Sequence, residues 1–124
     1  MISINKCASV TTTVTDTNTA KAVGSGNLDV FATPMMIALM EQAACKCLAD
    51  SLEPSQSSVG TQINVTHTAA SPLDAKITAK ATIENVDGRK ISFAVTAHDE
   101  ASVIGTGTHE RFVIDIERFM KKLE

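Results

Sequence analysis

The sequence predicts an α+β fold in which one long helix packs against a curved antiparallel β-sheet. Two observations lead to this expectation. Residues 30–49 are rich in Met, Ala and Leu, which are good helix formers, and they are apolar around almost the whole helix circumference. Several later segments alternate apolar and polar residues at the period of a β-strand. No internal repeat is visible, so residues 1–124 are expected to form a single domain.

The helical stretch carries Thr33 followed by Pro34 near its start. A threonine hydroxyl can accept a hydrogen bond from the free backbone N–H groups of a first helical turn. Proline at the first helical position loses no hydrogen bond, because its missing donor would have had no partner there. The sequence therefore predicts that Thr33 is the N-cap of this central helix.

Glu41 is the unusual residue of the central helix, because it shares a stripe with apolar neighbours at spacings of three and four. A carboxylate in such surroundings must be paired, hydrogen-bonded or shifted in pKa. The plainer alternative is that Glu41 lies beside Gln42 and Lys46 on a narrow solvated edge. The residue pattern by itself leaves both interpretations open.

The other elements follow from alternation and from the turn residues between them. Strands are expected at residues 3–15, 21–23, 59–69, 75–86, 91–97 and 103–114. A flexible loop is expected at residues 24–27, a hairpin turn at residues 87–88, and a short charged C-terminal helix at residues 116–123. The chain thus reads as a strand, the central helix and then several antiparallel strands.

Two of these strands contain residues whose role the alternation leaves open. His67 falls on the more apolar face of residues 59–69, together with Val59, Thr61, Ile63 and Val65. It is either a hydrogen-bonded core histidine or a functional one. In residues 103–114 neither face is clearly the core, and the two glycines of this segment indicate a bulge or a close approach by a ligand.

Composition excludes several classes of function. The formal net charge is −3 and the chain has no Trp, no Tyr and four Phe, so neither a basic nor a base-stacking nucleic-acid surface is expected. The apolar run is interrupted by Glu41 and falls short of the roughly 20 residues that span a membrane. Residues 1–6 lack an apolar signal core, and three cysteines cannot all pair within one chain. A cytoplasmic protein with reduced cysteines is therefore expected.

The predicted layout resembles the hotdog fold, and three runs of residues carry a closer resemblance. These runs are Val30-Phe31-Ala32-Thr33-Pro34 leading to Glu41, Val59-Gly60-Thr61 leading through Asn64-Val65-Thr66-His67 to Ala69-Ala70-Ser71-Pro72, and Val103-Ile104-Gly105-Thr106-Gly107-Thr108-His109-Glu110-Arg111-Phe112-Val113-Ile114-Asp115. Across residues 5–115 they resemble the fluoroacetyl-CoA thioesterase family of hotdog proteins. Each run is a weak indication alone, and their joint presence is specific.

The resemblance implies an acyl-CoA thioesterase with a threonine, a glutamate and a histidine as its catalytic group, at the positions of Thr33, Glu41 and His67. It also implies that Gly60 presents its backbone N–H to the substrate and that Arg111 lies near the same site. No separate cofactor and no metal are implied, since coenzyme A is part of the substrate. A homodimer with its site at the subunit interface is the partner that the resemblance implies.

One departure from the family concerns substrate choice. The fluoroacetyl-specific enzyme has phenylalanines in its lid segment, whereas residues 24–27 here read Gly-Ser-Gly-Asn. The resemblance therefore carries over the hydrolysis of a small acyl-CoA thioester, without specificity for fluoroacetyl-CoA.

The chemical roles remain open at this point. Attack on the thioester carbonyl is possible by Thr33, by the Glu41 carboxylate, or by water activated by Glu41 or His67. The start of the central helix offers N–H groups for a developing oxyanion.

The main alternative function is a non-catalytic acyl-CoA-binding or sensing module, which would not need all of Thr33, Glu41 and His67. Enoyl-CoA hydration is disfavoured because no aspartate–histidine pair is found near the central helix, and metal catalysis because the three histidines lack ligand spacing.

Overall fold

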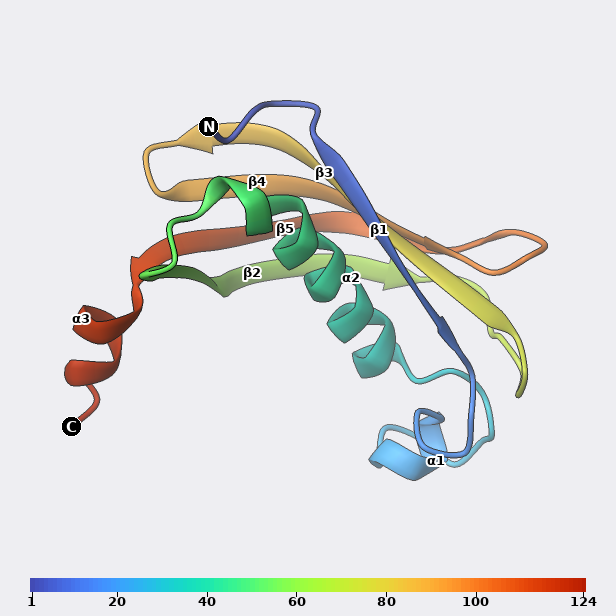
Figure 1. Cartoon of the computed structure of the whole chain (residues 1–124). Helices are drawn as coiled ribbons and strands as arrows, with labels where there is room; N and C mark the ends of the chain where they lie inside the picture. The colour runs from blue at the N-terminus through green and yellow to red at the C-terminus, as the bar shows by residue number, and fades with distance from the viewer.

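The protein is a five-stranded antiparallel sheet that curves around one long helix (Figure 1), as a computed structural model of residues 1–124 describes it. The strands, in the sheet order β1-β3-β4-β5-β2, are β1 (Cys7–Thr13), β3 (Lys76–Asp87), β4 (Lys90–His98), β5 (Val103–Asp115) and β2 (Gln56–His67). The helices are α1 (Ala20–Val23), α2 (Thr33–Leu48) and α3 (Ile116–Lys121), and a 3-10 turn follows α2 at Ala49–Ser51. The predicted α+β hotdog layout is confirmed.

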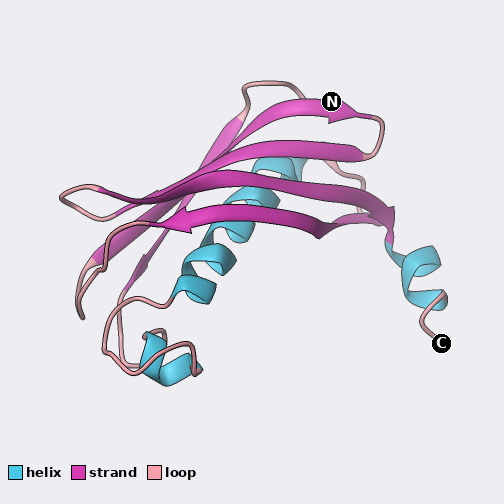
Figure 2. Cartoon of the chain, turned by 180° about the vertical axis from the view of Figure 1, so that it is seen from behind, coloured by secondary structure: helices cyan, strands magenta, loops and turns pink.

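All the helices leave one face of the sheet free. Figure 2, which shows the chain from behind, has the strands in front of α2. No helix covers the face of the sheet that points toward the viewer. The helices α1 and α3 lie at opposite ends of the sheet, α1 beside the start of α2 and α3 beside the end of β5 (Figure 1). The strand β2 forms an edge of the sheet, because only β5 pairs with it. None of the helices has both the length and the apolar content that a membrane span requires.

The core lies between α2 and the middle of the sheet. The inward residues of β3 and β4 are the ones that alternation predicted, namely Ile77, Ala79, Ala81, Ile83, Ile91, Phe93, Val95 and Ala97, and all are buried. They pack with the buried face of α2, formed by Met36, Leu39, Met40, Ala43, Ala44, Cys47 and Leu48. Each large apolar side chain buried in this way contributes about 1.5–3 kcal/mol. This rigid layer fixes α2 relative to the sheet and so positions the site.

The prediction that Thr33 caps the central helix is wrong. The N-cap is Ala32, and Thr33 and Pro34 are the first two helical residues. No side chain caps this end. Since proline fixes a helical backbone at the start without needing a donor, the helix can begin here without a capping hydroxyl. The Thr33 hydroxyl is consequently free for another partner.

The strand expected at residues 21–23 is also wrong, because Ala20–Val23 is the single turn of α1. Thr19 caps this turn by accepting a hydrogen bond from the Ala22 N–H at 3.2 Å. Gly24 ends it with a φ of 79°, a left-handed conformation that glycine adopts without steric cost. Local capping therefore outweighed the β-forming tendency of so short a segment.

A bulge in β2 changes the faces that alternation predicted for its first half. The register shifts between Gly60 and Gln62, and Gly60 pairs with Arg111 while Ile63 pairs with His109. Directly paired residues share a face, and both Arg111 and His109 are buried toward α2. Gly60 therefore faces the helix in place of Val59 and Thr61, since the inserted residue reverses the alternation. After the bulge, Ile63, Val65 and His67 face α2 as predicted.

The strand β5 presents its polar residues to the core. His109 and Arg111 are buried with Val113, whereas Phe112 on the other face is exposed. Gly105 is required by the protein's own packing, because a Cβ there would lie 2.6 Å from the Met36 sulfur and 2.8 Å from the Thr66 carbonyl oxygen. The glycines that sequence analysis associated with a bulge or a ligand thus let α2 and β2 approach β5 closely.

Candidate active site

Thr33 and His67 form the first polar pair of the site. Thr33 is the first residue of α2 and His67 is the last residue of β2, so two element ends meet here. The Thr33 Oγ1 atom lies 2.7 Å from His67 Nδ1, which is a short hydrogen-bond distance. Because the hydroxyl does not cap the helix, it is available for this bond. Two of the three predicted catalytic residues are therefore in direct contact.

The Thr33–His67 pair borders a cavity of about 270 Å³. The other residues that line this cavity are small or apolar, namely Ala20, Ser25, Val30, Phe31, Thr68, Ala69 and Ala70. Ser25 belongs to the loop at residues 24–27, so this loop forms part of the cavity wall. A small apolar group placed here would lie beside the two polar side chains.

His67 is held in a state suited to accepting a proton. Burial lowers its pKa, and a smaller opposing contribution comes from the Ala69 backbone. The neutral ring is therefore favoured. Its Nε2 atom is buried without a hydrogen-bond partner, while Nδ1 faces the Thr33 hydroxyl. Nδ1 is thus the ring nitrogen placed for chemistry with Thr33.

The start of α2 offers fewer free donors than the sequence suggested. The Ala32 carbonyl accepts from the N–H groups of Met35 and Met36, at 3.0 and 2.9 Å. Pro34 has no N–H, and Ala32 itself donates to the Asn18 carbonyl at 3.1 Å. The Thr33 N–H is therefore the one donor of the first turn that is left to meet an oxyanion.

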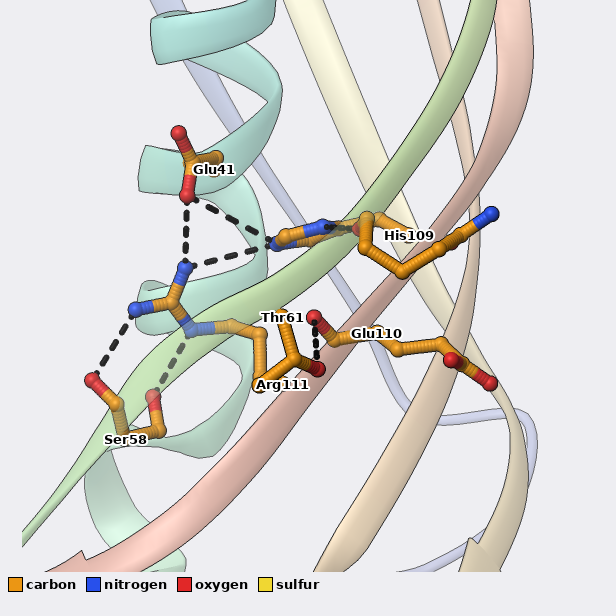
Figure 3. Close-up of polar contacts among 7 residues, drawn as sticks. Glu41, Ser58, Thr61, His109, Glu110 and Arg111 are labelled. Carbon is orange, nitrogen blue, oxygen red and sulfur yellow. Dashed lines mark hydrogen bonds and ion pairs between the residues drawn. The ribbon is translucent and has the colours of Figure 1, made fainter.

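Glu41 belongs to a second polar group, built across α2, β2 and β5 (Figure 3). Its Oε2 accepts a hydrogen bond from Arg111 Nη1 at 3.0 Å and lies 4.0 Å from His109 Nε2. Arg111 in turn donates to the hydroxyl and the carbonyl of Ser58. Glu41 is therefore a paired carboxylate, and the alternative of a merely solvated edge with Gln42 and Lys46 does not describe it.

Gly60 supplies the space for this second group. A Cβ on Gly60 would lie 2.6 Å from Glu41 Oε2 and 3.3 Å from both Arg111 Nη1 and the His109 ring. The three polar side chains thus pack directly against the bare α-carbon of Gly60. Glu41, Gly60 and His109 also line a cavity of about 280 Å³ with Thr61, Gln62 and Ile63. The predicted site residues Gly60, Arg111 and Glu41 are therefore in one place.

The two polar groups are separate within one chain. Thr33 and Glu41 lie at positions 33 and 41 of the same helix, so the rise between their α-carbons is about 12 Å. No hydrogen bond or ion pair joins Glu41 to Thr33 or His67. The chain thus assembles Thr33 with His67, and Glu41 with Gly60 and Arg111, without joining all three predicted catalytic residues.

Sequence analysis missed two members of the Glu41 group. His109 was named only within the resembling run and among the three histidines that lack metal-ligand spacing, and Ser58 was given no role. Both could have been suspected from Arg111, because a buried guanidinium needs several acceptors and β5 places His109 on the same face two residues away. No group of three or more His, Cys, Asp or Glu side chains is arranged to hold a metal ion.

Comparison with known proteins agrees with this architecture. The family model described as FlK, fluoroacetyl-CoA-specific thioesterase, matches residues 14–117. A protein named fluoroacetyl-CoA thioesterase, from Streptantibioticus cattleyicolor, is 48% identical over 95 residues, which are 77% of this chain and 68% of that protein.

Solved structures agree at the level of the whole chain. The crystal structure of a phenylalanine-to-alanine mutant of the fluoroacetyl-CoA-specific thioesterase FlK matches with a TM-score of 0.93 and 37% identity, covering 99% of this chain and 96% of that one. A Thermus thermophilus protein described as a thioesterase superfamily member matches with a TM-score of 0.89 and 25% identity, covering 99% and 93% of the two chains.

The fold and these relatives define a hotdog thioesterase, an enzyme that hydrolyses thioesters. Within that class, the chain belongs to the FlK family of fluoroacetyl-CoA-specific thioesterases. Acyl-CoA thioesterase activity follows from this membership, and the alternative of a non-catalytic binding module is disfavoured.

Proposed function

We propose that this enzyme hydrolyses a small acyl-CoA thioester through Thr33, His67 and Glu41. The observation that carries the proposal is the 2.7 Å contact between the Thr33 hydroxyl and the neutral His67 ring at the wall of a cavity of about 270 Å³. An acyl group in that cavity would bring its carbonyl beside a nucleophile and a proton acceptor. The oxygen would lie near the free Thr33 N–H at the positive end of α2.

Hydrolysis needs water to add to the carbonyl carbon, the carbon–sulfur bond to break, and a proton to reach the leaving thiolate. His67 Nδ1 can take a proton from Thr33 Oγ1, or from water held by that hydroxyl, and return it to the sulfur. Glu41 has one oxygen fixed by Arg111 and lines a cavity of about 280 Å³, so its other oxygen can activate water. Gly60 lines the same cavity and offers its backbone close to the substrate.

We further propose that the complete site forms between two copies of the chain. One chain holds its two polar groups about 12 Å apart on α2, so a second copy related by a two-fold axis can bring Glu41 to the Thr33–His67 pair. The unpaired edge of β2 supports this proposal, as does Ile63, which is 38% exposed although it faces α2. A sheet edge of this kind is normally covered in a stable protein.

Mixing two strongly impaired variants tests the shared site. Thr33→Ala and Glu41→Gln chains, exchanged in equimolar amounts, should regain about a quarter of wild-type activity, because half of the dimers would hold one intact site of two. Each variant mixed with itself is the control. A mixture that stays inactive after verified subunit exchange would place the whole site in one chain.

We propose that the acyl group is small and need not be fluorinated. The loop that borders the cavity contributes Ser25 and no aromatic residue, so it lacks an apolar gate. The relatives bear the name fluoroacetyl-CoA thioesterase, and a threonine-to-serine mutant of FlK is in complex with acetyl-CoA. We expect acetyl-CoA and other short acyl-CoA thioesters to be turned over within about tenfold of fluoroacetyl-CoA.

The deciding experiment measures free-thiol release from a series of acyl-CoA thioesters, short to long and with or without fluorine. Wild type is compared with Glu41→Gln, which should lose about 10²–10⁴-fold in kcat if the carboxylate moves a proton. Glu53→Gln, an exposed change in the connection between the 3-10 turn after α2 and β2, is the matched control. If turnover were unchanged in Glu41→Gln, a catalytic role of Glu41 would be excluded. A strong preference of wild type for fluoroacetyl-CoA would overturn the specificity proposal.

A further inference from the structure

The Arg111 guanidinium is almost entirely occupied by contacts within the protein. Its Nε donates to Ser58 Oγ at 2.8 Å, its Nη2 donates to the Ser58 carbonyl at 3.0 Å, and its Nη1 donates to Glu41 Oε2 at 3.0 Å. The same Nη1 lies 3.3 Å from His109 Nε2. Four of its five N–H groups are therefore engaged. Because Arg111 is only 6% exposed, little of it is left to contact a substrate.

The tautomer of His109 follows from its two neighbours. His109 Nδ1 lies 2.7 Å from the Gln62 carbonyl, which can only accept, so Nδ1 carries the proton. The Nε2 atom of the neutral ring then has a lone pair, and it accepts from Arg111 Nη1. If Nε2 carried the proton, its N–H would face the N–H of Arg111 Nη1, and neither group could accept a hydrogen bond. Burial lowers the pKa of His109, and the charge of Arg111 acts in the same direction, so the neutral ring is favoured.

The surroundings of His109 hold the ring in this orientation. The ring is 1% exposed, and it stacks on Phe93 with centroids 5.9 Å apart. The Gln62 carbonyl that anchors Nδ1 belongs to the bulged part of β2. His109 therefore presents a fixed acceptor to Arg111 from one side, and Ser58 presents two fixed acceptors from the other (Figure 3).

We infer that His109 is a positioning residue, which acts through Arg111 to hold one oxygen of Glu41 in place and leave the other facing the cavity. The inference rests on the proposed role of Glu41 in hydrolysis. The Glu41 side chain is 41% exposed and would otherwise sample several rotamers on the surface of α2. With Arg111 fixed by three acceptors, its Nη1 is a stationary anchor for the carboxylate. Arg111 accordingly positions Glu41, and its predicted contact with the substrate stays a prediction.

The test compares His109→Leu with His109→Gln. Leucine fills similar space without an acceptor, whereas the glutamine oxygen can replace Nε2 as the acceptor for Arg111. His109→Leu should lower kcat about tenfold or more with KM within about twofold, and His109→Gln should recover most of that loss. His98→Leu, at the exposed end of β4, is the matched control and should change neither constant.

A double-mutant cycle separates a positioning role from a structural one. If His109 acts through Glu41, adding His109→Leu to Glu41→Gln should not lower the residual rate further. An additive loss, or equal losses for His109→Leu and His109→Gln, would overturn the inference. Unchanged kcat in His109→Leu would overturn it as well.

An NMR measurement keeps the test independent of catalysis. The Arg111 side-chain N–H groups should exchange slowly with water in wild type and in His109→Gln, and quickly in His109→Leu. If Glu41→Gln retained full activity, the proposed function would fail, while this exchange measurement would still decide whether His109 fixes Arg111. Fast exchange in wild type would overturn the inference even if Glu41 proved essential.

Discussion

The two polar groups of this enzyme are built in opposite ways. Thr33 and His67 are joined by one hydrogen bond at the ends of two elements, beside a cavity and a loop. Glu41 is attached to Arg111, which is fixed by acceptors on β2 and β5, the two strands at one edge of the sheet. The difference shows how one small domain can combine a hydrogen-bonded pair at the wall of a cavity with a carboxylate whose partner is fixed by the sheet.

Among changes that leave Glu41 itself in place, Gly60→Ala should have the largest effect on the fixed group, which is Glu41 with Arg111, His109 and Ser58. The new Cβ would meet the Glu41 carboxylate at 2.6 Å, and the carboxylate is the flexible end of a side chain, so it will move aside. We expect kcat to fall about 100-fold while the free energy of unfolding changes by less than about 1 kcal/mol. Steady-state kinetics and urea unfolding measure the two quantities.

Gly105→Ala provides the contrast to Gly60→Ala. At Gly105 the added Cβ would meet the Thr66 backbone as well as Met36. A backbone atom of a paired strand cannot move away as the end of a side chain can. We expect this variant to lose about 1–3 kcal/mol of stability by overpacking. If Gly60→Ala were destabilised as much as Gly105→Ala, the loss of activity could not be assigned to the displaced carboxylate.

Thr33→Ala tests the open pair and should lower kcat about 10–100-fold, with Thr33→Ser retaining most activity because it keeps the hydroxyl. Since Thr33 is not the N-cap, the free energy of unfolding should change by less than about 0.5 kcal/mol. Thr66→Ala, next to His67 in sequence and exposed, is the control. A loss of about 1 kcal/mol in Thr33→Ala would show that the hydroxyl also stabilises the fold, through its bond to His67.

Ser58→Ala should have a smaller effect on the fixed group. It removes the acceptor of Arg111 Nε, but the Ser58 carbonyl still accepts from Nη2. We expect a loss of about two- to fivefold in kcat, since one of three fixed acceptors is gone and the other two remain. The same thiol-release assay measures it, and an effect larger than that of His109→Leu would contradict the ranking of the two anchors.

The smallest predicted effect is a pH dependence of stability. Burial lowers the folded-state pKa of His67 and of His109 below the unfolded value of 6.5. As the pH falls below 6.5, the unfolded chain binds protons that the folded chain does not, so the free energy of unfolding decreases. Urea unfolding at pH 7.5 and 5.5 should show this decrease, and His109→Gln should reduce it. If the free energy of unfolding of His109→Gln differed between pH 7.5 and 5.5 by as much as that of wild type, His109 would be excluded as a contributor.

Alternation and composition predicted most of the fold, because the inward faces of β3 and β4 and the apolar helix follow directly from burial. The prediction failed where tertiary packing or local capping decided. The bulge at Gly60 reversed the faces of early β2, and Thr19 with Gly24 made a helical turn of residues expected to be a strand. Such features depend on one extra residue or one cap, which a two-residue period cannot reveal.

The residues of the candidate site were predicted by family resemblance, and the sequence by itself determined which chemical groups are available: a hydroxyl, an imidazole and a carboxylate near one helix. Only the tertiary structure decided how they are grouped. It paired Thr33 with His67, because the ends of α2 and β2 meet, and it tied Glu41 to Arg111, His109 and Ser58, because the curved sheet brings β5 and the bulged β2 under the middle of α2. Sequence fixes side-chain chemistry locally, whereas hydrogen-bond partners far apart in the chain exist only once the sheet and helix have packed.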